Sequence, residues 1–180
     1  MAPDKLYLVG FMASGKTTVA RALALRLGWR AEDVDELIEQ RERLTVAEIF
    51  ARHGEPYFRA AERAMLRLLQ PLRHVVVATG GGTFVDPDNR TFINLDGVSV
   101  WIDVPLAELI PRIPHDGRRP LASTLADLER LYAGRVDAYR QARLRVDASR
   151  APVDMVVEQI LSGMDALPTV TDRDRSIEDF

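Results

Sequence analysis

The sequence of 180 residues contains no cysteine and only two lysines, Lys5 and Lys16. Without cysteine, neither a disulfide framework nor a thiolate metal site can form. No apolar run is long enough to cross a bilayer, and the first ten residues, MAPDKLYLVG, lack the apolar stretch of a secretory signal. These absences predict a cytoplasmic protein that has no membrane segment.

Charge of neither sign dominates the chain, since its formal net charge is −3 and its pI is near 5.7. This balance argues against a general nucleic-acid binder. Positive charge comes almost entirely from arginine, whose planar fork suits phosphate and carboxylate oxygens. Genome composition also enriches arginine, and it is the preferred explanation for most of these side chains. A length of 180 residues fits a single domain with a core of its own.

Short β-rich runs alternate with longer helical patterns, which predicts an α/β fold with a parallel sheet. Strands are expected at residues 6–10, 31–34, 75–79, 98–103 and 144–147. Helices are expected at residues 16–27, 34–41, 45–53, 57–69, 105–112, 123–142 and 153–162. Thr45 and Glu48 have the spacing of a capping box, which favours a helix start at this point.

Two segments have the composition of mobile chain. Residues 115–120, HDGRRP, place glycine, proline and paired arginines between helical patterns, as is typical of a surface loop. Residues 165–180, DALPTVTDRDRSIEDF, are polar and weakly periodic. We expect these last residues to form a flexible acidic tail.

A phosphate-binding loop is predicted at residues 10–17, GFMASGKT, which match the pattern G-x-x-x-x-G-K-[ST]. A β-run precedes the loop and a helical pattern follows it, as the motif requires. Backbone N–H groups and the helix N-terminus bind phosphate oxygens, the lysine reaches the β- and γ-phosphates, and the threonine hydroxyl ligates Mg²⁺. The ATP site is therefore expected to contain Ala13, Ser14, Gly15, Lys16, Thr17 and Thr18.

Two aspartates, Asp33 and Asp35, flank Val34 at the end of the second β-run. Ligands of open α/β sheets bind at the carboxyl ends of the strands, so both carboxylates are candidates to face the phosphates. One carboxylate would hold Mg²⁺ through water, and the other would orient or deprotonate an attacking hydroxyl. Taken alone, an Asp-x-Asp pair is more often a solvated helix start.

Three consecutive glycines, Gly80, Gly81 and Gly82, follow the apolar run VVVAT. Such a run at the end of a buried strand lets a ligand approach the backbone closely. A merely flexible turn is an equally good explanation when the glycines are considered by themselves.

Taken together, these segments resemble the shikimate kinase family. The resemblance extends from about residue 5 to residue 162. It rests on GFMASGKTT, DVD at 33–35, GEPYFRAAE at 54–62, TGGG at 79–82, RRPL at 118–121 and RVDAYR at 135–140. The phosphate-loop pattern is shared by many NTPases, whereas the ordered combination is much more specific.

The resemblance implies roles for residues on the acceptor side. Asp35 would contact the shikimate hydroxyls and act as the base, while Asp33 would lie in the outer shell of Mg²⁺. Arg59 and Arg135 would bind the shikimate carboxylate, and Glu62 would hold Arg59 in position. The glycines Gly80, Gly81 and Gly82 would line the substrate site, with the Gly81 backbone touching shikimate. Taken singly, Arg59 and Arg135 would be read as surface residues.

Roles on the nucleotide side are implied in the same way. Arg119 corresponds to the lid arginine that closes over the transferring phosphate, and Arg112 and Arg150 correspond to positions around the adenine. The chain departs from the family pattern at Ala13, where glycine is commoner. It departs again at Thr83 and Phe84, where a small residue and valine are commoner. Pro111 interrupts the helix before Arg112.

The expected fold is a three-layer P-loop kinase domain with a five-stranded parallel sheet over residues 1–164. It would carry a substrate-binding insert at about 34–66 and a mobile lid at about 114–123. The expected reaction is transfer of the ATP γ-phosphoryl group to the 3-hydroxyl of shikimate, with Mg²⁺ bound, by a monomer. The alternatives are a related gluconate-type kinase and a nucleotide-binding domain that has lost catalysis.

Overall fold

Five strands form one parallel sheet in the computed structural model, which describes residues 3–113 and 124–167. The strands are β1 (Lys5–Val9), β2 (Arg30–Asp33), β3 (Val75–Ala78), β4 (Val98–Asp103) and β5 (Leu144–Asp147). Their order is β2-β3-β1-β4-β5, and every neighbouring pair is parallel. The predicted α/β class and sheet are confirmed, and each strand lies within one residue of its expected bounds.

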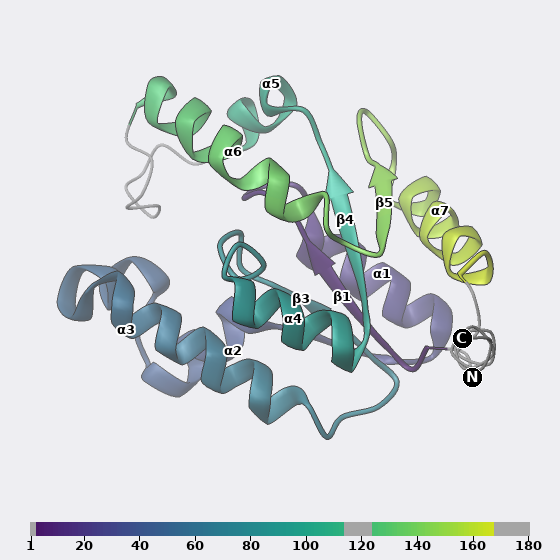
Figure 1. Cartoon of the computed structure of the whole chain (residues 1–180), viewed down its shortest axis with the longest axis horizontal. Coiled ribbons are helices and arrows are strands. Elements are labelled where there is room, and N and C mark those ends of the chain that lie inside the picture. Colours follow the sequence, from purple (N-terminus) through teal and green to yellow (C-terminus); the bar gives the residue numbers. More distant parts are fainter. Residues whose placement is uncertain (1–2, 114–123, 168–180) are drawn as a thin grey trace, which may run out of the picture.

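Helices cover both faces of this sheet, as Figure 1 shows. They are α1 (Lys16–Leu27), α2 (Val34–Glu42), α3 (Val46–Leu69), α4 (Pro87–Asp96), α5 (Leu106–Leu109), the 3₁₀ turn η1 (Ile110–Arg112), α6 (Leu125–Tyr139) and α7 (Val153–Asp165). Helices α1 and α7 pack together on one face, whereas α3, α4 and α6 lie on the other. Three layers result, as expected.

Helix α3 contains the two helices expected at 45–53 and 57–69, and a kink separates them as the sequence predicted. The chain continues from Val46 to Leu69 with a kink at Gly54, whose φ of 80° and ψ of 171° are not helical. Pro56 follows the kink, and a proline in the first turn after a break costs no hydrogen bond. The predicted capping box of Thr45 and Glu48 is confirmed at the start of this helix.

Helix α4 was not predicted from the sequence, although two local signals mark its start. The Asp86 side chain accepts hydrogen bonds from the backbone N–H groups of Asp88 and Asn89, and Pro87 occupies the first turn. Both features are typical of a helix N-terminus. The expected helix at 105–112 is also shorter, because the helix passes into a 3₁₀ turn that contains Pro111.

The two central strands that precede the candidate site, β1 and β3, lie in the core of the molecule. All residues of β1 and β3 are buried, because helices cover both of their faces. The carboxyl ends of these two strands lead into the phosphate loop and the triple glycine, so both loops start from fixed positions. The predicted lid at 114–123 and residues 168–180 of the predicted tail lie outside the described residues. Among the helices that are described, none has the length and apolarity to cross a membrane.

Candidate functional site

The loop between β1 and α1 has a backbone that few residue types accept. Gly10 has a φ of 141° and Gly15 a φ of 88°, and Ala13 has a φ of 61° although it carries a side chain. Left-handed conformations of this kind cost a residue with a Cβ about 1–2 kcal/mol. Gly15 supplies no side-chain cap to α1, so the first-turn N–H groups are left to an anion.

Lys16 lies folded back onto this loop. Its Nζ donates to the carbonyl oxygens of Gly10 at 3.0 Å and Phe11 at 2.7 Å, and the residue is 9% exposed. A cavity of about 260 Å³ lies beside it. The cavity is also lined by Gly15, Thr17, Thr18, Asp33, Asp35, Gly81 and Arg112. Three segments expected to meet, namely the phosphate loop, the aspartates and the triple glycine, therefore share one cavity.

The sequence left two alternatives for Asp33, a helix start and a side chain that faces the phosphate loop, and the structure combines them. Its Oδ1 accepts hydrogen bonds from the backbone N–H groups of Asp35 and Glu36 and so caps α2. Its Oδ2 accepts a hydrogen bond from the Thr17 hydroxyl at 2.5 Å, which joins β2 to the phosphate loop. Asp33 is thus a helix cap and part of the cavity wall at once.

The Thr17 hydroxyl oxygen and Asp33 Oδ2 are suited to Mg²⁺, the ion that the resemblance implies. A hydroxyl and a carboxylate are hard oxygen donors, which Mg²⁺ prefers. Within the described ranges no group of three or more His, Cys, Asp or Glu side chains is placed to hold a metal. Mg²⁺ in kinases needs only one or two protein oxygens, because substrate phosphates and water complete its shell. Thr17 and Asp33 therefore fit this ion.

Charged side chains pack closely against the triple glycine. A Cβ on Gly80 would lie 2.6 Å from Glu62 Oε1 and 2.8 Å from Asp35 Oδ1. A Cβ on Gly82 would lie 2.6 Å from Arg59 Nη1 and Nη2. A Cβ atom does not tolerate contacts this short, so a side chain at either position would push the ends of the Glu62, Asp35 or Arg59 side chains away. Glycine therefore permits the close approach of these side chains to the backbone.

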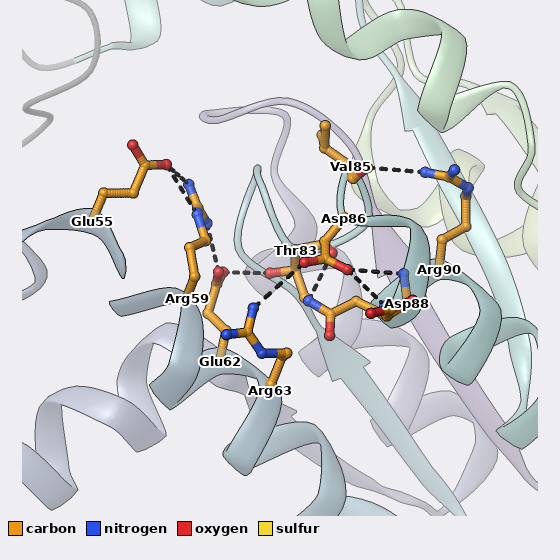
Figure 2. A network of polar contacts seen from close by, with 10 residues as sticks. Glu55, Arg59, Glu62, Arg63, Thr83, Val85, Asp86, Asp88 and Arg90 are labelled. Carbon is orange, nitrogen blue, oxygen red and sulfur yellow. Dashed lines mark hydrogen bonds and ion pairs between the residues drawn. The ribbon is translucent and has the colours of Figure 1, made fainter. Parts of the chain in front are cut away.

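Arg59, on α3, is held by two carboxylates of its own helix (Figure 2). Its Nη1 donates to Glu62 at 2.5 Å, while its Nε and Nη2 donate to Glu55 at 3.1 and 3.0 Å. Burial by itself would lower the pKa of Arg59, but the two carboxylates outweigh it and raise the pKa. The guanidinium is therefore a permanent positive charge.

Arg135, on α6, is buried on the other side of the glycine loop. Its guanidinium lies over the Phe11 ring, 5.7 Å from the centroid. Tyr139, one turn further along α6, donates a hydrogen bond of 2.5 Å to the Gly81 carbonyl oxygen. Burial raises the pKa of Tyr139 to about 12, so the phenol remains a donor at neutral pH. No role was predicted for Tyr139, although it belongs to the motif RVDAYR. It lies four residues after Arg135 and therefore on the same face of α6.

A second cavity, of about 410 Å³, brings the two arginines together. Its lining includes Arg59, Gly82, Arg135, Glu55, Asp86 and Arg130. Arg59 comes from α3 and Arg135 from α6, and the sequence separates them by more than seventy residues. The glycine loop separates this cavity from that of Lys16, because Gly81 lines one and Gly82 the other.

The two arginines expected around adenine, Arg112 and Arg150, differ in their positions relative to the Lys16 cavity. Arg112 lines the Lys16 cavity, and its Nη2 lies 3.8 Å from Glu108. The Arg150 side chain is 92% exposed and lies 3.9 Å from the same glutamate. Arg150 is absent from the lining of both cavities described above. Arg119 belongs to residues 114–123, which the structure does not describe.

The sheet order, the loop before α1 and the polar groups at the carboxyl ends of β1, β2 and β3 together define a P-loop kinase. Comparisons with known proteins narrow this class. The family model described as shikimate kinase matches residues 12–165. The chain belongs to the shikimate kinase family.

Individual relatives agree with this assignment. A shikimate kinase from Synechococcus elongatus is 41% identical over 170 residues, which cover 92% of this chain and 87% of the relative. The solved structure of shikimate kinase from Acinetobacter baumannii in complex with shikimate has a TM-score of 0.85 and 32% identity, covering 92% of this chain and 96% of that one. The crystal structure of shikimate kinase from Aquifex aeolicus has a TM-score of 0.82 and 34% identity, covering 89% and 96%.

Proposed function

We propose that the chain transfers the γ-phosphoryl group of ATP to the 3-hydroxyl of shikimate, yielding shikimate 3-phosphate and ADP. One observation carries this proposal: a cavity beside the phosphate loop and a cavity lined by Arg59, Arg130 and Arg135 adjoin a single glycine loop. A hydroxy-carboxylic acid needs guanidinium groups for its carboxylate and a carboxylate near its reacting hydroxyl. The A. baumannii relative, whose structure contains shikimate, supports the choice of acid.

On the nucleotide side, the backbone of residues 13–18 and the N-terminus of α1 bind the phosphates. Lys16 leaves its carbonyl partners and neutralises charge on the β- and γ-phosphate oxygens, an interaction that strengthens in the transition state. Thr17 would hold Mg²⁺ directly, and Asp33 would hold it through water. When bound, this ion neutralises phosphate charge and helps to align the transferred group.

On the acceptor side, Arg59 and Arg135 bind the carboxylate of shikimate and so set its orientation. Asp35, which lines the Lys16 cavity, receives the proton of the attacking hydroxyl. The roles of Arg119 as the lid arginine, and of Arg112 and Arg150 near the adenine, stay part of the proposal. We also propose that the enzyme acts as a monomer in the cytoplasm, where ATP is supplied.

A coupled assay of ADP release tests this function. Turnover should require Mg²⁺ and rise strongly when shikimate is added, while gluconate should have no effect. Equal turnover with and without shikimate, together with stimulation by gluconate, would favour a gluconate-type kinase. Nucleotide binding without turnover under any of these conditions would indicate a domain that has lost catalysis.

A further inference from the structure

Glu62 and Glu55 contact the same guanidinium but differ sharply in their surroundings. The Glu62 side chain is 0% exposed, whereas the Glu55 side chain is 45% exposed at the rim of the second cavity. Arg59 itself is 17% exposed. One carboxylate is therefore built into the protein interior, and the other can reach water by rotating its side chain.

The buried carboxylate has a second anchor, which Figure 2 shows. Glu62 Oε2 accepts from Arg59, and Oε1 accepts a hydrogen bond of 2.5 Å from the Thr83 hydroxyl. Thr83 is itself fixed, because its N–H donates to the Gly80 carbonyl at 3.2 Å and its carbonyl accepts from Asn89 Nδ2 at 3.2 Å. Thr83 is one of the positions where this chain departs from the family pattern.

Glu55 occupies the part of the guanidinium that faces the cavity. Its Oε1 accepts from both Nε and Nη2, the two donors of one edge of the guanidinium. A carboxylate ligand can pair with this edge through both of its oxygens. A substrate carboxylate that binds Arg59 at this edge must first displace the Glu55 carboxylate. Glu62 has no comparable freedom, since both of its oxygens are engaged in the interior.

We propose that Glu55 is an exchangeable stand-in for the substrate carboxylate on Arg59, while Thr83, through Glu62, is a positioning residue that keeps Arg59 in place during the exchange. The inference rests on the proposed function, because it takes a hydroxy-carboxylic acid as the ligand of Arg59. Competition from Glu55 weakens substrate binding, and the anchoring by Thr83 strengthens it. Substitutions of Glu55 and Thr83 should therefore change the KM for shikimate in opposite directions.

Steady-state kinetics with shikimate varied at saturating ATP test both parts. Glu55→Gln keeps the shape of the side chain but weakens the rim ion pair, so the KM for shikimate should fall about 1.5- to 5-fold. Thr83→Val keeps the shape but removes the donor to a buried carboxylate, so the KM should rise about 5- to 30-fold. Thr83→Ser keeps the hydroxyl and should have the wild-type KM for shikimate. The KM for ATP should stay unchanged in all three variants.

Controls separate this exchange from general charge effects and from misfolding. Glu158→Gln makes the same charge change at an exposed site on α7, and it should leave the shikimate KM unchanged. In an Arg59→Ala background, Glu55→Gln should have no further effect, because the competition acts through Arg59. Thermal melting of Thr83→Val and Thr83→Ser shows whether a KM change accompanies an intact fold.

An unchanged or raised KM in Glu55→Gln overturns the exchange, and so does an equal fall in the Arg59→Ala background. A wild-type KM in a folded Thr83→Val variant overturns the anchoring role. If Thr83→Val does not fold, Thr83→Ala replaces it: a raised KM in the folded alanine variant supports the role of the hydroxyl, and a wild-type KM opposes it. Failure of the proposed function looks different, since the wild-type enzyme itself would then show no turnover with shikimate.

Discussion

The two ends of the sheet each hold one of the chain's two lysines, and the lysines are bound in different ways. At the amino end, Lys5 is 0% exposed and its Nζ lies 2.7 Å from Asp96 Oδ2. At the carboxyl end, Lys16 donates to carbonyl oxygens of its own loop. The negatively charged carboxylate of Asp96 stabilises the ammonium group of Lys5. The bonds described for Lys16 are to neutral backbone carbonyl groups.

The amino end is a closed polar network that joins three elements. Lys5 also donates to the carbonyl oxygens of Leu69 and Gln70 at the end of α3, and Tyr7 donates to Asp96 at 2.5 Å. Burial and the bond to Asp96 raise the pKa of Tyr7, so the phenol stays a donor. These contacts tie α3 and α4 to β1. The comparison therefore separates a lysine that joins three elements of the fold from one that lines a cavity.

The largest effect is expected from Lys16→Met. The variant should lose about 10³-fold or more in kcat/KM, because charge stabilisation in the transition state is lost, and its melting temperature should stay close to that of the wild type. The coupled assay and a thermal melt measure the two quantities. Wild-type turnover would show that this loop is not the active phosphate site.

Lys5→Met should have the opposite profile. Removing one partner of a buried pair leaves Asp96 uncompensated, which costs about 3–5 kcal/mol of unfolding free energy. Urea unfolding measures this loss, and the folded fraction should keep its turnover. Combining Lys5→Met with Asp96→Asn should recover part of the stability, because the stranded charge is gone. A larger loss in the double variant than in Lys5→Met would contradict the pairing.

The aspartates extend the comparison, since each end of the sheet also has a carboxylate. Asp35→Asn should lower kcat by roughly 10²-fold with a smaller change in shikimate binding, because an amide still donates to a hydroxyl but cannot accept its proton. Asp96→Asn serves as the matched control, and it should change stability rather than rate. A loss confined to the KM would mean that Asp35 only positions the substrate.

Ala13→Gly should have the smallest effect and tests the shape of the loop around Lys16. Glycine relieves the strain of a φ of 61°, but it also increases the freedom of the unfolded chain. These contributions oppose each other, so the unfolding free energy should change by less than about 1 kcal/mol. Urea unfolding measures it. A loss above about 2 kcal/mol would show that the alanine methyl group has a packing role that its backbone angle does not reveal.

Much of the fold could be predicted because the signals for it are local. The positions of β1, β3 and β4 followed from buried apolar runs, and the phosphate loop followed from glycine, lysine and threonine at fixed spacing. Helix α4 escaped prediction, since its first turn was marked only by Asp86 and Pro87 and its apolar face is short. The interruption of α3 at Gly54 was predicted, because Gly54 and Pro56 are residues that interrupt a helical pattern.

The sequence by itself determined the positions of most strands and the phosphate loop, since each depends on neighbours within a few positions. Only the tertiary structure decided which partners the polar residues of the site have. Thr83 meets Glu62 across 21 positions, and Tyr139 meets Gly81 across 58. The physical reason is that a buried donor takes whichever acceptor the packing of α3, α6 and the glycine loop brings within about 3 Å. Nothing in the spacing of the residues specifies that packing.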